Sequence, residues 1–501
     1  MNRFSNAFIL IGIALFTLFI LLIDLGNYRI TITAAVAILM AFWWMTEAIP
    51  LYVTSLIPLV VFPLSGILSA SKISDSYINS IIFLFLGGFL IAIAIESWNL
   101  HKRIALKIIL FFGTKPSRLL LGFMVASAFL SMWISNTATA LMMLPVAFAV
   151  MKQFSESSEE NVNLSKALLL GIAYSCSIGG IATLVGTQPN LVFLRVVKIS
   201  FPASPQVNFV DWMMMALPIS ILILLLACIV IRFLFKLNKI ESNIQQLSDR
   251  NLILSEYKKL GPMSYEEKVV AAVFLMTVIL WITRTNIEMG FIKLTGWSNL
   301  LNLQNYVDDS TVAIFSALIL FLIPAKSKNI IDTKRILSIN AIEKVPWSVI
   351  LLFGGGFALA TAFTESGLST FIGSKLKNFG HIDIIFLIFI ISITINFLTE
   401  FTSNTAVTQM ILPVLSSIAI SLNYHPFLLM IPATLAASMA FMLPVGTPPN
   451  TIVFSSNKLK IIDMVKTGFL LNLLSTIVIS LIVYFLGNII FDLSIFPDWA
   501  K

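Results

Sequence analysis

The sequence predicts an all-α polytopic membrane protein with about 11 transmembrane helices and two re-entrant helical hairpins. Three observations predict this class. Of the 501 residues, 58% are hydrophobic and only 11% are charged, whereas a soluble domain carries about 25% charged residues. Apolar runs of about 20 residues, the length of a membrane-spanning helix, recur along the whole chain. One polar motif also occurs twice, each time in the middle of an apolar segment.

The crossing segments follow from the positions of the apolar runs. We expect them at 7–24, 30–48, 50–66, 80–100, 165–194, 212–235, 268–284, 310–325, 348–366, 427–455 and 467–492. The first run is predicted to be a span and not a removed signal, because no small-residue cleavage site follows it. The segments 120–150 and 384–420 are long enough to enter and leave the membrane on the same side. We interpret both as re-entrant hairpins, whose tips need protein or water around them.

The distribution of basic residues predicts the orientation. With a cytoplasmic N-terminus, the inner side holds 23 of the 32 Lys and Arg residues, namely Arg3 and those in the inner loops, including the loops at 101–118 and 232–268. This bias favours an N-terminus inside and a C-terminus outside, in a multi-pass protein of the plasma membrane. The net charge of +8 is then explained by topology, and no nucleic-acid partner is expected.

The chain contains an internal repeat. Met132–Val146 and Glu400–Val414 match at eight of fifteen positions, 268 residues apart, and both contain the triplet Ser-Asn-Thr. A second pair, Val185–Asn190 and Val445–Asn450, reads Val-Gly-Thr-Gln-Pro-Asn and Val-Gly-Thr-Pro-Pro-Asn at a spacing of 260. We therefore divide the chain into an extra first span at 1–29, a first half at 30–235, a cytoplasmic linker at 236–267, a second half at 268–492 and an extracytoplasmic tail at 493–501.

The two halves are expected to have opposite orientations. Five predicted crossings separate equivalent points, so hairpin 120–150 opens to the cytoplasm and hairpin 384–420 to the outside. Inverted repeats are characteristic of secondary transporters, in which the binding site lies between the repeats near the middle of the membrane. The two Ser-Asn-Thr triplets can then meet at this site from opposite sides.

The Gly-Thr-x-Pro-Asn motifs predict a break in each of two spans. Proline removes a backbone donor and glycine tolerates unusual backbone angles, so each span should divide into two half-helices. Exposed amides at a half-helix N-terminus attract an anion, and unwound carbonyls can coordinate a cation. No Lys or Arg lies in the triplets or the breaks. Bound Na⁺ could offset the charge of an anion; a neutral solute is the alternative.

Glu400 precedes the second triplet, and its counterpart in the first half is Met132. Intramembrane carboxylates are functional candidates by default. Glu400 could couple protons, tune the local charge or pair structurally, while Glu96 and Glu365 are expected to pair with a helix end or a lysine. We find no nucleophile–base set, nucleotide loop or metal cluster, so an enzyme is not expected.

These motifs resemble the divalent anion:sodium symporter family. The similar segments are Met45–Pro63 (MTEAIPLYVTSLIPLVVFP), both triplets, Ser177–Asn190 (SIGGIATLVGTQPN) and Val445–Asn450, and the match covers nearly the whole chain. The resemblance implies a homodimer in the lipid membrane whose transport domains slide against fixed scaffold domains, as in an elevator. It also implies symport of a dianionic substrate with at least two Na⁺ ions.

The resemblance also implies roles for individual residues. The substrate site would comprise Asn136, Thr137, Thr187, Asn404, Thr405 and Pro448. One Na⁺ would bind Ser131, Ser135, Asn136 and Gly186. The second would bind Thr399, Thr402, Ser403, Asn404 and Gly446, largely through carbonyl groups.

In the family that the sequence resembles, members that prefer citrate or sulfate often vary in one triplet, so the resemblance implies a C4-dicarboxylate such as succinate, malate or fumarate. A sodium-independent dicarboxylate exchanger and a symporter of sulfate or another divalent oxyanion are the alternatives within the family, and a channel is an alternative outside it. One departure from the internal symmetry is Gln188, which occupies the position of Pro448. Its added polar group could alter substrate choice.

Overall fold

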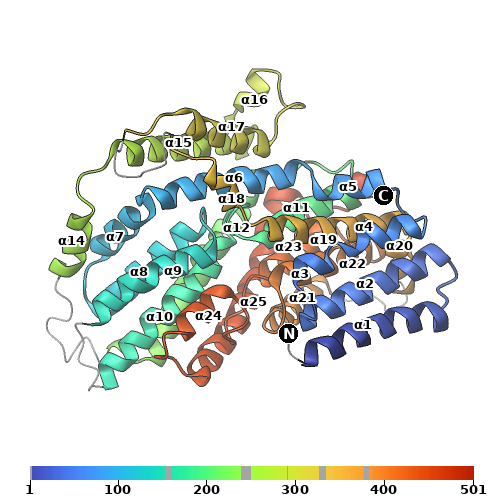
Figure 1. Ribbon diagram of the computed structural model, residues 1–501, viewed down its shortest axis with the longest axis horizontal. Helices are drawn as coiled ribbons and strands as arrows, with labels where there is room; N and C mark the ends of the chain where they lie inside the picture. Colours follow the sequence, from blue (N-terminus) through green and yellow to red (C-terminus); the bar gives the residue numbers. More distant parts are fainter. Residues whose placement is uncertain are drawn as a thin grey trace.

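The computed structural model describes residues 3–152, 159–238, 250–289, 292–326, 335–376 and 383–500, and it is almost entirely helical (Figure 1). Within these ranges, eight helices are long and apolar enough to cross a membrane, and six shorter apolar helical segments accompany them. The prediction of an all-α polytopic membrane protein is confirmed.

Helix α1 (Arg3–Leu22) packs against the first helix of the first half. The helices of the first half are α2 (Tyr28–Thr46), α3 (Leu51–Thr54), α4 (Ile57–Leu64), α5 (Ala70–Tyr77), α6 (Ser80–Ser97), α7 (Leu100–Phe112), α8 (Pro116–Ser131), α9 (Asn136–Met151), α10 (Glu159–Gly180), α11 (Gln188–Ser200) and α12 (Phe209–Leu234). The segment 50–66, expected as one span, therefore forms two short helices. Pro50 and Pro58, which lack backbone N–H groups, stand at or near their starts.

The linker contains α14 (Arg250–Lys259), and the second half begins three residues before the expected boundary, at Tyr265. Its helices are α15 (Tyr265–Ile282), α16 (Trp297–Leu300), α17 (Asp309–Leu322), α18 (Asn340–Glu343), α19 (Trp347–Ser366), α20 (Leu368–Leu376), α21 (Ile384–Thr399), α22 (Asn404–Ser421), α23 (Phe427–Ala436), α24 (Pro448–Phe454) and α25 (Ile461–Phe491). A final 3₁₀ turn, η2, spans Asp498–Ala500. The early start of α15 reflects a capping box, in which Ser264 and Glu267 satisfy each other's backbone N–H groups.

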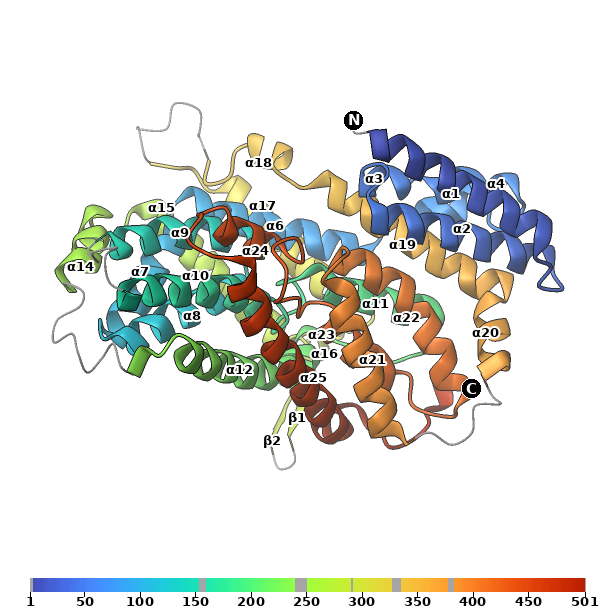
Figure 2. The same ribbon diagram turned by 90° about the horizontal axis from the view of Figure 1, so that it is seen from below.

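The bounds of the helices follow the internal repeat of the sequence. The bounds of α21 lie 268 residues after those of α8 at both ends, and α22 begins 268 residues after α9. The two halves pack on each other through α12 and α25, and α8 packs on α10 as α21 packs on α23. Figure 2 shows α8, α9 and α10 on one side of α25 and α21 and α22 on the other.

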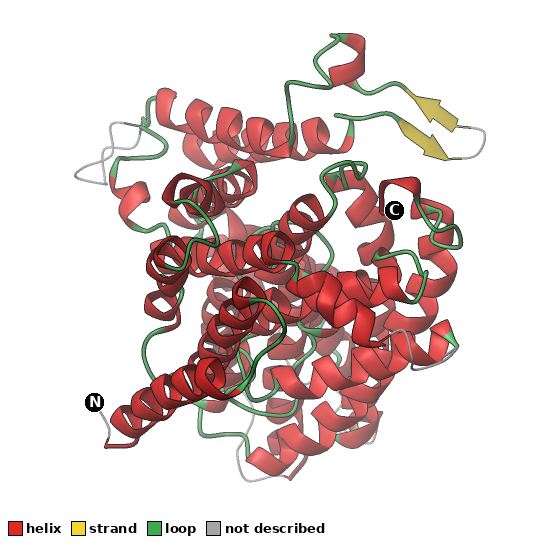
Figure 3. Cartoon of the chain, turned by 90° about the vertical axis from the view of Figure 1, so that its right-hand side faces the viewer, coloured by secondary structure: helices red, strands yellow, loops and turns green. Residues whose placement is uncertain are grey.

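The two termini lie on opposite sides of the molecule in Figure 2, with the N-terminus near α3. Strands β1 (Ile287–Met289) and β2 (Ile292–Leu294) form a short antiparallel pair at the edge of the molecule, on the side of the C-terminus (Figure 3). These strands were not expected from the sequence.

One predicted loop is wrong. Residues 101–118 were expected to be a loop, but most of this segment belongs to α7, whose helix buries Leu106 and Ile109. The guanidinium of Arg103 on α7 donates to both carboxylate oxygens of Glu267 on α15, at 2.9 Å each. The charges that suggested a loop therefore lie on an amphipathic helix, and one of them is buried in an ion pair.

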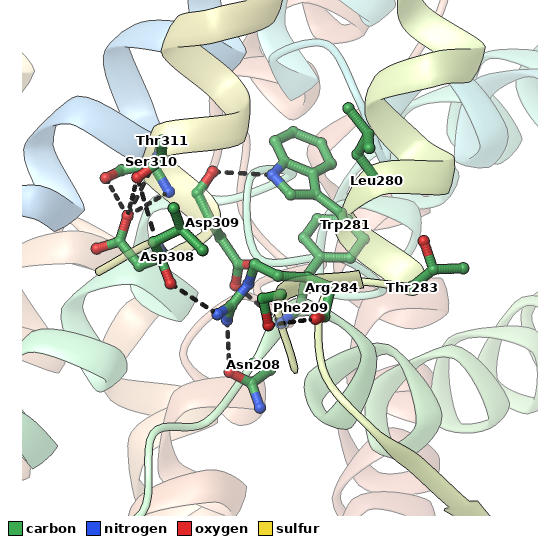
Figure 4. A network of polar contacts seen from close by, with 12 residues as sticks. Asn208, Phe209, Leu280, Trp281, Thr283, Arg284, Asp308, Asp309, Ser310 and Thr311 are labelled. Atoms are coloured by element: carbon green, nitrogen blue, oxygen red, sulfur yellow. Dashed lines mark hydrogen bonds and ion pairs between the residues drawn. The ribbon is translucent and has the colours of Figure 1, made fainter. Parts of the chain in front are cut away.

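A buried polar network anchors the start of α12 to α15 and α17 (Figure 4). The Arg284 side chain, only 1% exposed, donates through Nε to Asp309 Oδ1 at 2.6 Å and through Nη2 to Asn208 Oδ1 at 2.5 Å. The other carboxylate oxygen of Asp309 accepts from the backbone N–H of Phe209 at 3.0 Å. The bond from Phe209 satisfies one of the backbone N–H groups that lack a partner within the first turn of α12, and the network fixes the position of this helix end.

Candidate substrate and cation site

Each Ser-Asn-Thr triplet forms the turn of a helical hairpin. Ser135 is the N-cap of α9 and its side chain accepts from the backbone N–H of Ala138, while Ser403 caps α22 in the same way at Ala406. Serine is favoured at this position because its oxygen satisfies an N–H group that has no partner within the helix. The cap residues therefore start both second helices of the hairpins at the asparagines.

The two asparagines make matching contacts. Ser131 Oγ donates to Asn136 Oδ1 at 2.5 Å, and Thr399 Oγ1 donates to Asn404 Oδ1 at 2.5 Å. Ser131 and Thr399 are fully buried one turn before the triplets. Because each amide uses its oxygen as the acceptor, its NH₂ group keeps two protons for another acceptor.

The predicted breaks are present. Helix α10 ends at Gly180 and α11 begins at Gln188, while α23 ends at Ala436 and α24 begins at Pro448. Thr187 and Thr447 are the N-caps of the helices that follow the breaks, and both are buried.

A buried asparagine folds each break. Asn190 Nδ2 donates to the carbonyl of Thr183 at 2.7 Å and to that of Gly180 at 3.3 Å. Asn450 Nδ2 makes the equivalent bonds to Leu443 at 3.0 Å and Ala440 at 3.1 Å. These asparagines were not predicted to have an individual role, although their recurrence in both motifs was the signal that could have identified them.

Oxygen atoms gather at the first break. A methyl group added at Gly180 would lie 2.7 Å from Asn136 Oδ1 and 3.2 Å from the Gly186 carbonyl oxygen. One added at Gly186 would lie 3.0 Å from the Ser131 carbonyl oxygen. Glycine is required at both positions because any side chain would fill the space among these oxygens. Hydroxyl, amide and carbonyl oxygens are the ligands that hard cations take, so this group of atoms suits Na⁺.

The second break differs because it contains a carboxylate. Glu400 is 1% exposed, and its Oε1 accepts from the backbone N–H groups of Phe441 at 2.7 Å and Met442 at 2.8 Å and from Asn472 Nδ2 at 2.7 Å. Its Oε2 accepts from the Leu443 N–H at 2.9 Å. Of the three roles left open for Glu400, these contacts favour the structural one. Glu365 forms an ion pair with Lys72, N to O 2.7 Å, as expected for a lysine partner.

Gly446 brings the second break close to this carboxylate, since an added methyl group there would lie 3.0 Å from Glu400 Oε2. Thr399 Oγ1 lies 3.0 Å from the Ala437 carbonyl oxygen as well as beside Asn404. Thr402, in the turn after α21, donates its hydroxyl to the Leu398 carbonyl at the end of that helix, at 3.1 Å. The Thr402 hydroxyl is therefore occupied by a local backbone contact, as the Ser403 hydroxyl is by its cap to Ala406.

Both hairpin turns and both breaks line one cavity of about 260 Å³. The predicted residues on its wall include Ser135, Asn136, Thr137, Gly186, Thr187, Asn404 and Pro448. Other wall residues were not singled out from the sequence, among them Phe85, Phe89, Trp133, Val185 and Pro346. Thr405 is buried behind this wall and donates to Gln188, which lines the cavity. The structure thus brings the residues of the two distant motifs to one place.

The described wall carries no Lys, Arg, Asp, Glu or His side chain. Its polar groups are amides and hydroxyls, which can donate hydrogen bonds to carboxylate oxygens without supplying charge. The arrangement can therefore orient a polar or anionic solute and hold cations beside it. No nucleophile with an adjacent base lines the described wall.

Comparison with known proteins agrees with this geometry. Residues 1–493 match the family described as the sodium:sulfate symporter transmembrane region. The chain is 42% identical over 487 residues to the sodium-dependent dicarboxylate transporter SdcS of Staphylococcus saprophyticus, covering 95% of this chain and 90% of that one. It is 41% identical over 468 residues to SdcS of Staphylococcus aureus strain MRSA252, covering 92% and 86%.

Solved structures with the same fold are more distant in sequence. The YdaH transporter of Alcanivorax borkumensis superimposes with a TM-score of 0.53 at 11% identity, covering 85% of this chain and 87% of that one. MtrF of Neisseria gonorrhoeae gives a TM-score of 0.55 at 11% identity, covering 96% and 97%. The family match and the SdcS relatives confirm the resemblance seen in the sequence. The chain belongs to the sodium:sulfate symporter family and is a multi-pass membrane transporter, not an enzyme.

Proposed function

We propose that this transporter is a Na⁺-coupled symporter of C4-dicarboxylates such as succinate, malate and fumarate. The observation that carries the proposal is a cavity rich in amide and hydroxyl donors whose described wall has no basic side chain. A dianion cannot leave water for such a cavity without compensating charge. The oxygen clusters at the two breaks could supply that charge by holding Na⁺ next to the anion. The SdcS relatives are named as sodium-dependent dicarboxylate transporters.

The position of the cavity supports alternating access between inverted halves. Phe85, Gly88 and Phe89 of α6 line it, whereas Gly356 of α19, the equivalent of Gly88, lies against the side chain of Gln409 of α22. The cavity also reaches Pro346, at the end of α19 that we assign to the cytoplasm. We therefore infer an inward-facing state of an elevator mechanism. We further propose that the transporter is a plasma-membrane homodimer with its N-terminus inside and its C-terminus outside.

Uptake of labelled succinate into proteoliposomes tests the proposal. We expect an inward Na⁺ gradient to drive uptake, and replacement of Na⁺ by K⁺ or choline to abolish it. Asn136→Ala and Asn404→Ala should abolish uptake while the protein still elutes as a folded species. Asn305→Ala, in an exposed loop, is the matched control and should transport normally.

The alternatives give different results. Uptake that ignores Na⁺ but requires internal dicarboxylate would identify an exchanger and overturn the coupling. Complete competition by sulfate at concentrations similar to succinate would identify an oxyanion symporter and overturn the substrate class.

A further inference from the structure

Gln188 makes the first helix break chemically different from the second. It is the first residue of α11, and its counterpart Pro448 is the first residue of α24; both line the cavity. A proline in this place has no side-chain hydrogen-bonding group, whereas glutamine brings one acceptor and two donors. The two ends of the cavity therefore differ in chemistry although their backbones are alike.

The Gln188 side chain reaches across to the other half. Its Oε1 accepts from Thr405 Oγ1 at 3.3 Å, and Thr405 is buried at the turn of the second hairpin. The equivalent contact between Thr137 and Pro448 cannot form, because proline offers no side-chain acceptor. Gln188 thus links the first break to the turn of the second hairpin.

This contact occupies the hydroxyl proton of Thr405, at the end of the cavity formed by the second hairpin. A threonine hydroxyl has one proton. When Thr405 donates it to Gln188, it cannot donate to a substrate at the same time. The amide NH₂ of Gln188 has two protons and makes no hydrogen bond to the part of the chain that the structure describes, so it is free to serve an acceptor in the cavity.

We propose that Gln188 is a substrate-contacting, specificity-determining residue whose Nε2 donates to one carboxylate of the bound dicarboxylate, in place of Thr405. The inference rests on the proposed dicarboxylate function. At the opposite end, Asn136 and Thr137 keep their donors for the other carboxylate. A ligand that uses both ends must carry two separated acceptor groups, as a C4-dicarboxylate does and the single compact sulfate ion does not.

Kinetics of succinate uptake with Gln188→Ala test the proposal. Loss of one hydrogen bond to a charged group should raise the KM for succinate about tenfold or more. The maximal rate and the half-saturating Na⁺ concentration, measured at saturating succinate, should change less than twofold. Relative inhibition of uptake by sulfate should increase, because succinate loses a contact that sulfate does not use. Gln206→Ala, an exposed glutamine outside the cavity, is the matched control.

The variant Thr405→Val tests whether Gln188 contacts the substrate or only links the first break to the second hairpin through Thr405. If Thr405 only orients Gln188, Thr405→Val should raise KM by less than Gln188→Ala does, and the double variant should equal Gln188→Ala alone. An unchanged KM in Gln188→Ala, or effects of the two substitutions that multiply, would overturn the proposal. Failure of the wild-type protein to take up succinate with Na⁺ would instead overturn the proposed function, so the two failures are distinguishable.

Discussion

Replacement of Glu400 by glutamine should weaken the second break. The carboxylate accepts four hydrogen bonds, from the N–H groups of Phe441, Met442 and Leu443 and from Asn472 Nδ2. Glutamine has nearly the same shape but only one acceptor oxygen. If that oxygen takes the place of Oε1, three of the bonds survive and the new NH₂ group faces the N–H of Leu443.

The expected loss of stability follows from these contacts. An N–H group left without an acceptor costs about 1–3 kcal/mol, and each surviving bond loses roughly 1 kcal/mol when its acceptor becomes neutral. Removal of a buried charge returns part of this free energy. We therefore expect Glu400→Gln to lower the free energy of unfolding by about 2–4 kcal/mol.

Equilibrium unfolding of the purified protein in mixed micelles, followed by tryptophan fluorescence, measures this loss. Glu365→Gln is the matched control, because Glu365 has a single ion-pair partner and its side chain is 41% exposed. An exposed pair contributes only about 0–1 kcal/mol. Equal unfolding free energies for the two variants would refute a structural role for Glu400.

Three further predictions concern other parts of the molecule. Arg284→Met should lower the free energy of unfolding by about 3–5 kcal/mol by leaving Asp309 charged and unpaired, and adding Asp309→Leu should restore most of it in the same unfolding assay. Gly180→Ala would place a methyl group 2.7 Å from Asn136 Oδ1. The overpacking cost of ~1–3 kcal/mol should raise the half-saturating Na⁺ concentration for uptake about tenfold. Unchanged Na⁺ dependence would contradict a cation site there. Burial lowers the pKa of His425, between α22 and α23, from 6.5 to about 4. The unfolded chain therefore takes up a proton at a higher pH than the folded protein does. The free energy of unfolding should be constant above about pH 6.5 and drop by about 2 kcal/mol by pH 5. Melting curves of His425→Gln should lack this pH dependence.

The local features of the site could be predicted from the sequence. The Ser-Asn-Thr turns and the breaks at Gly-Thr-x-Pro-Asn depend on residues within one short segment, and each motif occurs twice. Serine caps, glycine backbones and proline helix starts are local physical preferences. For the same reason the bounds of α8 and α21 could be placed within a few residues.

Features that depend on distant partners could not be predicted. Glu400 meets Asn472, and Arg103 on α7 meets Glu267, 164 residues further along the chain. From the sequence alone, a charged residue between apolar runs favours a loop, and only the partner shows that it is buried. The link between Gln188 and Thr405 likewise joins the two halves of the chain.

We propose that cations held beside the two hairpin turns make the cavity able to accept a dianion. Calorimetric titration of succinate into the purified transporter, in NaCl and in choline chloride, tests it most directly. We predict saturable binding in Na⁺ and none in choline, with binding in Na⁺ lost in Asn136→Ala and in Asn404→Ala. Succinate binding of equal affinity in both salts would show that bound Na⁺ is not needed for the cavity to accept the dianion.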